Sequence, residues 1–144
     1  GSEMCIRDRL LTVAAAFVAC GQKPAGNSVD SIRSSDGVEV LSFHAKKRCP
    51  TCIAIENLTR EVVEADFAAQ LADSSLVFRV VNISEEEALA DKYEVTWSSL
   101  LVIRHRKGAE RVTDLTESAF ANARTNPEKF KAELRAAIRK QLDR

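Results

Sequence analysis

Two cysteines separated by two residues are the most chemically distinctive feature of the sequence, Cys49-Pro50-Thr51-Cys52. An apolar run that ends at Phe43 precedes them, and a segment with helical periodicity follows them. A thiolate at the start of a helix faces unsatisfied N–H groups and the positive end of the helix dipole, and this lowers the pKa of such a thiol. We therefore expect Cys49 to be the exposed attacking sulfur, and Cys52, one turn later, to be the buried resolving sulfur.

The residues next to Cys49 favour the same chemistry. Pro50 suits the first position of a helix, because its missing N–H would have no partner there. Lys46, Lys47 and Arg48 directly precede Cys49 and place positive charge on the same side. These features predict a redox site at the junction of a strand and a helix.

Length and composition set the class of protein. A chain of 144 residues can form one domain with a substantial core, and 45% hydrophobic with 29% charged residues is typical of a soluble globular protein. The formal net charge of zero argues against a general nucleic-acid binder, so we expect no nucleic-acid partner. The other two cysteines, Cys5 and Cys20, precede the expected fold, so the cysteines do not indicate a disulfide framework.

The N-terminal segments at 1–36 are expected to lie outside the folded domain. Residues 1–9 match nothing that follows and are interpreted as a tag or as adaptor-derived sequence. Residues 10–20 form a short apolar run after two arginines, too short to span a bilayer but typical of a secretory signal. The alternative is a fragment of a buried helix. Residues 21–36 are rich in small polar residues, glycine and proline, and predict a flexible linker.

The end of the apolar run, Phe17-Val18-Ala19-Cys20-Gly21, resembles the lipobox of bacterial lipoproteins. In those proteins the cysteine is lipidated and becomes the new N-terminus. The resemblance implies lipidation at Cys20, contact with a membrane through the lipid, and a place in the bacterial cell envelope on its periplasmic side.

Hydrophobic periodicity predicts an alternation of strands and helices in the domain at 37–144. The expected elements are strands at 38–43, 76–81, 100–103 and 110–112, and helices at 50–71, 84–93 and 126–142. Ser84 and Glu87 form a capping-box pattern for the second helix. Asn126 and Pro127 are the expected first residues of the last helix, which carries an apolar stripe.

This order, with the cysteine pair at the first strand-to-helix junction, resembles the thioredoxin fold over roughly residues 37–142. The resemblance implies an α/β fold in the order β-α-β-α-β-β-α, with a mixed central sheet flanked by helices. It implies a thiol–disulfide oxidoreductase in which Cys49 is the nucleophile and Cys52 the resolving thiol, with no metal or organic cofactor. The implied partners are protein or small-molecule thiols and disulfides, and an upstream redox partner.

The sequence departs from the thioredoxin pattern around the cysteines. Arg48 replaces the family's tryptophan, and the dipeptide Pro50-Thr51 replaces Gly-Pro. The family's buried acid would lie near Ser42, where this chain has no carboxylate, so water, His44 or a lysine would take the proton from Cys52.

The loop before the apolar strand also differs from the family. Ser99 takes the place of the family's cis-proline, which guides the substrate chain. A cis bond before a residue other than proline costs about 3–4 kcal/mol. We expect Ser98 and Ser99 to support the site and to dock substrate, with Trp97 either flanking the site or covering the end of the sheet.

Three functions remain open at this stage. The first is thiol–disulfide exchange through Cys49 and Cys52. The second is a Cu(I)- or Zn(II)-binding module that uses both cysteines and His44. The third is a non-catalytic adaptor in which the two cysteines form a permanent disulfide.

Overall fold

The structure is a computed structural model, and it describes residues 36–143. The expected tag, signal segment and lipidation site at Cys20 lie outside the described residues, as does the expected linker except for Asp36. The Asp36 carboxylate accepts a hydrogen bond from the Lys107 backbone N–H at 2.7 Å, so this residue already contacts the folded domain. Within the described part of the chain, no helix is both long enough and apolar enough to cross a membrane.

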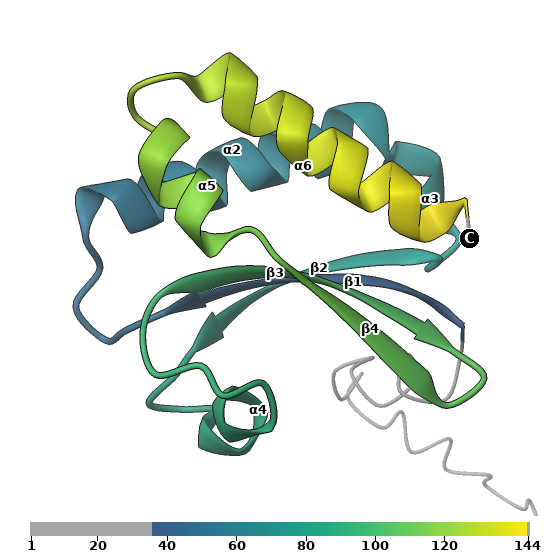
Figure 1. Ribbon diagram of the computed structural model, residues 1–144, viewed down its shortest axis with the longest axis horizontal. Helices are drawn as coiled ribbons and strands as arrows, with labels where there is room; N and C mark the ends of the chain where they lie inside the picture. The colour runs from purple at the N-terminus through teal and green to yellow at the C-terminus, as the bar shows by residue number, and fades with distance from the viewer. Residues whose placement is uncertain (1–35, 144) are drawn as a thin grey trace, which may run out of the picture.

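A four-stranded mixed sheet in the order β2-β1-β3-β4 forms the centre of the domain (Figure 1). Its strands are β1 (Gly37–His44), β2 (Leu76–Asn82), β3 (Ser99–Arg106) and β4 (Ala109–Asp114). The β1 strand pairs with β2 in parallel and with β3 in antiparallel orientation, and β3 pairs with β4 as a hairpin. The α/β fold with a mixed central sheet that was expected from the sequence is thus confirmed.

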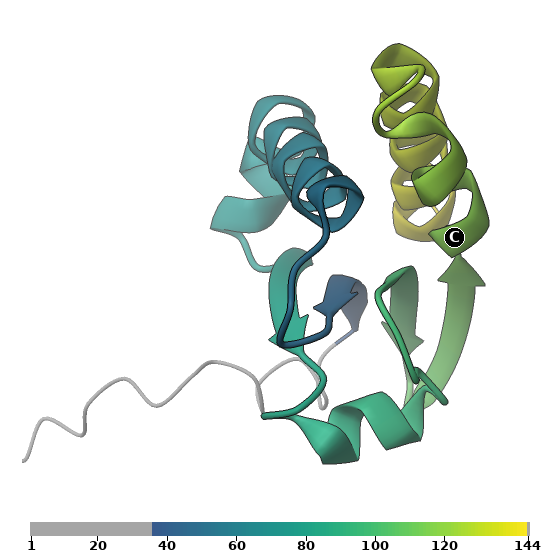
Figure 2. The same ribbon diagram turned by 90° about the vertical axis from the view of Figure 1, so that its left-hand side faces the viewer.

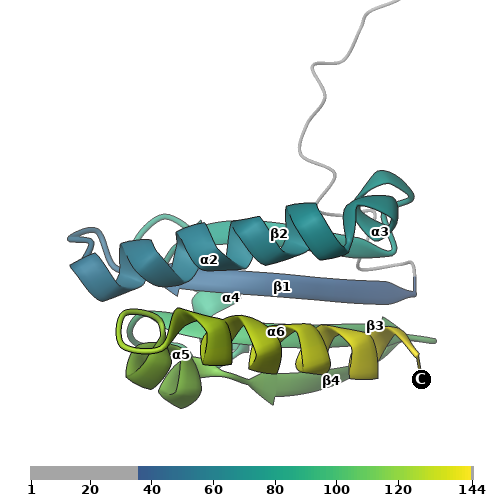
Figure 3. The ribbon, with the colours of Figure 1, turned by 90° about the horizontal axis from the view of Figure 1, so that it is seen from above.

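Helices cover both faces of the sheet unequally. The helices α2 (Pro50–Asp66), α3 (Ala68–Ala72), α5 (Thr116–Asn122) and α6 (Pro127–Leu142) lie on one face, and α4 (Glu87–Lys92) lies on the other (Figure 2). Seen from above, α2 and α6 run side by side, roughly along the direction of the strands (Figure 3). Each face has its own apolar core. One includes Val40, Ile55, Val62, Leu134 and Ile138, and the other Leu41, Phe43, Val81, Leu89 and Ile103.

The alternating direction of side chains along a strand explains this double-sided core. In β1 six consecutive residues, 38–43, are buried, because neighbouring side chains point to opposite faces and both faces are covered. The β3 strand has the same character at Leu100–Ile103. A strand buried on both faces holds its C-terminal end rigidly, and the end of β1 leads directly into the cysteine loop.

The helix boundaries differ from expectation at two places. The first helix ends at Asp66 and not near residue 71, because Phe67 leaves the helical region (φ −129°, ψ 27°) and its side chain is buried, with 3% exposure. The capping box expected at Ser84 and Glu87 is absent, because the Ser84 N–H is bonded to Asn82 Oδ1 at 3.1 Å and α4 begins without a side-chain cap.

The α5 helix was not expected from the sequence. It is short, and its first residue, Thr116, is buried; the Thr116 hydroxyl accepts a hydrogen bond from the Leu100 N–H at 3.1 Å. The expectation for α6 is confirmed: the Asn126 side chain accepts a hydrogen bond from the Lys129 N–H at 3.2 Å, and Pro127 is the first helical residue.

Candidate active site

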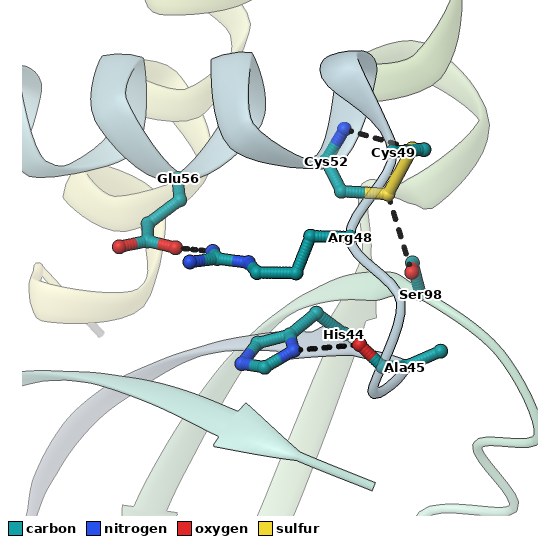
Figure 4. The surroundings of a disulfide bond; sticks show 7 residues. All are labelled: His44, Ala45, Arg48, Cys49, Cys52, Glu56 and Ser98. Carbon is teal, nitrogen blue, oxygen red and sulfur yellow. Dashed lines mark hydrogen bonds and ion pairs between the residues drawn. A yellow bond between two sulfur atoms is a disulfide. The ribbon is translucent and has the colours of Figure 1, made fainter.

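The cysteine pair is closed as a disulfide at the start of α2 (Figure 4). Cys49 and Cys52 are bonded through their sulfur atoms, with their Cα atoms 5.1 Å apart. Cys49 is the N-cap residue, its backbone is extended (φ −84°, ψ 154°), and Pro50 is the first helical residue. The Cys49 sulfur accepts a hydrogen bond from the Cys52 N–H at 3.1 Å, the bond that an oxygen of Ser, Thr, Asp or Asn normally accepts at this position.

Burial and charge distinguish the two sulfur-bearing residues. Cys49 is partly exposed, whereas Cys52 is buried with 8% exposure. Pro50 is exposed and Thr51 is partly buried, and the first turn of α2 contains no acidic residue. No side-chain carboxylate of this turn therefore offsets the positive end of the α2 dipole near Cys49.

Ser98 contacts the buried sulfur from the loop before β3. Its Oγ lies 3.3 Å from Cys52 Sγ, and because a disulfide sulfur has no proton, the hydroxyl is the donor (Figure 4). Ser99 does not contact the sulfurs; its hydroxyl donates to the Trp97 carbonyl at 3.1 Å. Residues 36–143 contain no cis peptide bond, so the chain enters Ser99 in trans.

Arg48 is directed away from the sulfur atoms. Its guanidinium forms an ion pair with Glu56, a partly buried carboxylate two turns into α2 that also pairs with Arg60 at 3.1 Å (Figure 4). This differs from the expectation that Arg48 adds positive charge beside Cys49. The lysine pair at 46–47 stays exposed, so that pair supplies the positive charge of the loop.

His44 does not join the cysteines. Its Nδ1 lies 2.9 Å from the carbonyl oxygen of its neighbour Ala45, and Figure 4 shows the ring directed away from the disulfide. Among residues 36–143, no three His, Cys, Asp or Glu side chains are grouped so that they could hold a metal ion. The geometry thus gives no support to a metal site built from the cysteines and His44.

A buried charged cluster at the other end of the sheet was not anticipated. Glu39 in β1 has 7% exposure, and its carboxylate lies 3.1 Å from His105 Nε2 and 3.5 Å from Arg79. His105 lies two residues after the strand predicted at 100–103, but the observed β3 continues through it; the residue is buried, and its Nδ1 faces Glu110 at 3.3 Å. Burial raises the pKa of Glu110, but the hydrogen bond and charge attraction to Lys92, together with His105 and Tyr93, outweigh burial, and the pKa lies below its usual value.

The distance between Glu39 and the cysteines decides whether this carboxylate could take the proton from Cys52. Glu39 precedes the end of β1 by five residues, and at about 3.3 Å per residue it lies roughly 16 Å along the strand from the cysteine loop. Ser42, nearer the site, is buried with 4% exposure. The sequence signal that could have located the cluster is a glutamate within a run of buried strand positions, since a buried carboxylate requires a charged partner.

Comparison with known proteins shows what the fold resembles. No protein-family profile matches the sequence, and no curated protein matches it. Among solved structures, the thioredoxin of Trichomonas vaginalis is 16% identical, with 76% of this chain and 86% of that one covered and a TM-score of 0.51. The first two thioredoxin domains of Saccharomyces cerevisiae Eps1p are 17% identical, with 84% and 43% covered and a TM-score of 0.53. The chain therefore has a thioredoxin-like fold with a disulfide-forming C-x-x-C pair at its first strand-to-helix junction.

Proposed function

We propose that the protein is a thiol–disulfide oxidoreductase that acts on protein or small-molecule disulfides. The observation that carries the proposal is the position of Cys49: this partly exposed residue caps a helix with its sulfur, which accepts a hydrogen bond from the Cys52 N–H, while its disulfide partner is buried. A reduced Cys49 thiolate in this place would receive the same hydrogen bond in charge-assisted form and the favourable end of the α2 dipole.

The exchange follows in two balanced steps. In the reduced protein, the Cys49 thiolate attacks one sulfur of a substrate disulfide, forms a mixed disulfide, and releases the other substrate sulfur as a thiolate. Cys52 then loses its proton to solvent and attacks Cys49, which restores the Cys49–Cys52 disulfide and releases the second substrate thiolate. Two electrons pass from the protein to the substrate, and an upstream dithiol must return them.

Cys49→Ser in the full chain tests the proposal directly. With dithiothreitol as the electron donor, the unmodified protein should accelerate the reduction of insulin disulfides, and the variant should fall to the rate of dithiothreitol alone. Cys5→Ser is the matched control, because it removes a thiol from the chain but not from the site, and it should retain the activity. Retained insulin reduction by Cys49→Ser would overturn the mechanism.

Alkylation separates exchange from a permanent structural disulfide. Mild treatment with a glutathione redox buffer should open the Cys49–Cys52 bond and make both sulfurs reactive toward iodoacetamide. If the pair never titrates within the range of cellular thiol potentials, the protein is a non-catalytic adaptor.

Ser98 supports the resolving sulfur in this proposal. A neutral hydrogen bond is worth about 0.5–1.5 kcal/mol, and one to a charged group about 1.5–3 kcal/mol. Because the Ser98 hydroxyl would therefore stabilise the Cys52 thiolate that forms in the second step more than the Cys52 thiol, Ser98→Ala should slow the attack of Cys52 on the mixed disulfide. An unchanged rate of this step, measured by the release of thiol from a preformed mixed disulfide, would show that the 3.3 Å contact has no energetic role.

We further propose that lipidation of Cys20 holds the domain at the periplasmic side of a bacterial envelope. The support is the lipobox-like sequence alone. Expression of the chain in a bacterial host with labelled palmitate should label the protein. Cys20→Ser should abolish the label and Cys5→Ser should retain it, whereas label on the Cys20 variant would contradict the anchor.

A further inference from the structure

A pocket of about 380 Å³ opens beside the loop that carries Ser98. Its volume lies within the range of small-ligand sites in proteins. The lining comes from the loop before β3, the end of β4 and the helix α5, and consists of Trp97, Ser99, Asp114, Thr116, Glu117 and Phe120. None of these residues takes part in the two steps of the proposed thiol–disulfide exchange, so the pocket requires a separate explanation.

Aromatic rings form the apolar part of the pocket. Trp97 and Phe120 are stacked, with ring centroids 5.4 Å apart and an angle of 28° between the planes. Trp97 is 59% exposed, the largest exposed fraction among the large apolar side chains that the structure shows at the surface. An indole held by one neighbour and open to solvent offers a face to a ligand, and tryptophan is the best side chain for contact with a cation.

The charged groups of the pocket all have one sign. Asp114 and Glu117 are its only charged lining residues, and both are exposed carboxylates. Asp114 is held in place because one of its oxygens accepts a hydrogen bond from the Thr116 N–H at 2.8 Å. A carboxylate pair beside an open indole is complementary to a cationic side chain, because both the carboxylates and the aromatic face attract positive charge.

Hydrogen bonds to β3 hold the pocket residue Thr116 in place. The Leu100 N–H donates to the buried Thr116 hydroxyl at 3.1 Å, and the Leu115 N–H donates to the Leu100 carbonyl at 2.9 Å. The start of α5 is thereby attached to the strand that follows the Ser98 loop. A site held in this way needs little ordering when a ligand binds, and this reduces the entropic cost of binding.

Ser98 connects the pocket to the disulfide. Trp97 and Ser99 flank Ser98, whose hydroxyl contacts the Cys52 sulfur at 3.3 Å. The first turn of α2 and the helix α5 lie at the same end of the molecule (Figures 1 and 3). An extended peptide advances about 3.3–3.6 Å per residue, so a side chain two to four residues from a substrate cysteine could enter the pocket while that cysteine reacts.

We propose that this pocket is a specificity subsite for a lysine or arginine side chain of a polypeptide substrate, placed a few residues from the cysteine under attack. The cation lies over the Trp97 ring and pairs with Glu117 and Asp114. The role in substrate choice rests on the proposed exchange activity, whereas binding of the cation depends only on the pocket. Basic polypeptide segments near a disulfide are thus the preferred substrate class.

The first experiment measures binding without any redox step. Trp97 is the only tryptophan of the chain, so its fluorescence reports on the pocket alone. The oxidised full chain is titrated with a short cysteine-free peptide that contains one arginine, and with the same peptide carrying glutamine instead. A cation–π contact and an exposed ion pair together predict binding of the arginine peptide roughly three- to tenfold tighter. Glu117→Gln should reduce this preference, and the matched surface variant Glu64→Gln should not.

The second experiment links binding to exchange. The same two peptides, each with a cysteine three residues from the arginine or glutamine and joined to glutathione by a disulfide, are compared as substrates by their kcat/KM. We expect the arginine peptide to be favoured roughly three- to tenfold at low salt, mainly through KM, with a smaller ratio at high salt. Trp97→Ala should bring the ratio near one.

Different failures overturn different claims. Equal binding of the two cysteine-free peptides, or a preference that Glu117→Gln leaves unchanged, would show that the pocket is only a hollow at the end of the sheet. Preferential binding of the arginine peptide with no reduction of either disulfide would support the subsite and overturn the exchange function. Equal reduction of both disulfides would support the exchange function and overturn the subsite.

Discussion

The first turns of α2 and α6 have the same local structure but different expected roles. Each begins with a capping residue followed by proline, and each cap accepts a hydrogen bond from the N–H three residues later. In α6 the cap is the amide oxygen of Asn126, at 3.2 Å from the Lys129 nitrogen. In α2 the cap is the sulfur of Cys49, at 3.1 Å from the Cys52 nitrogen.

The second helical position shows how the two turns differ. In α6 it is Glu128, whose carboxylate lies at the positive end of the helix dipole and stabilises the helix. In α2 it is Thr51, and the first turn has no acidic residue. The same backbone arrangement is a structural cap in α6, where the neighbouring residue Glu128 carries the negative charge. It is a candidate reactive site in α2, where the capping sulfur of Cys49 can itself carry a negative charge.

The largest expected effect separates activity from stability at α2. Cys49→Ser should remove insulin reduction completely. It should change the free energy of unfolding by only about 0.5 kcal/mol relative to the reduced protein, because serine is a preferred cap. Urea denaturation with dithiothreitol present measures the second part. A large loss of stability would mean that the sulfur has a structural role that the oxygen cannot fill.

The converse effect is expected at α6. Asn126→Ala should lower the free energy of unfolding by about 1 kcal/mol, which corresponds to a fall in Tm of about 4–8 °C for a domain of this size. Insulin reduction at a temperature well below Tm should not change. Thermal unfolding followed by circular dichroism gives the shift, and Asn126→Ser, which keeps a capping oxygen, should recover most of it.

A smaller effect is expected when Thr51 of α2 is replaced by glutamate, the residue that α6 has at the corresponding position. Thr51→Glu places a carboxylate beside the Cys49 sulfur, where it competes with the thiolate for the positive end of the dipole. Alkylation of reduced Cys49 at neutral pH should slow roughly two- to fivefold. Thr51→Gln is the matched neutral control. Equal rates for both variants would indicate that the dipole does not control this sulfur.

The smallest effect is expected from the reverse change in α6. Glu128→Thr should cost about 0.3–1 kcal/mol of stability at low salt, and less at high salt, because it removes the favourable charge at the dipole. It also removes the ion pair of 3.3 Å between the exposed Glu128 carboxylate and Lys131, which adds little because Lys131 also pairs with Glu61 at 2.6 Å. Denaturation at two salt concentrations tests this, and a loss independent of salt would point to packing instead.

The sequence was sufficient to predict the strands, the long helices and the cysteine junction, because these depend on local rules. Period-two and period-3.6 patterns, proline at a helix start and asparagine at a cap act over a few residues. The break at Phe67 was not predicted, because there the burial of one aromatic side chain determines where the helix ends.

The site could be predicted only in part, because its remaining contacts are long-range. That Ser98 would lie near the cysteines followed from the resemblance to thioredoxins. That its hydroxyl would contact Cys52, and that Arg48 would turn to Glu56, depends on side-chain positions that no local pattern encodes. The pocket at Trp97 requires α5, a helix too short to be seen in the periodicity.

The most direct test of the account is competitive alkylation of the reduced full chain. A small amount of iodoacetamide is added at neutral pH, and the modified cysteines are located by mass spectrometry of the peptides. A capping thiolate that is partly exposed should react at least about tenfold faster than a buried partner, so the label should be found on Cys49 before Cys52. Label on Cys52 first, or equal label on both, would contradict the claim that the sulfur capping α2 is the reactive one.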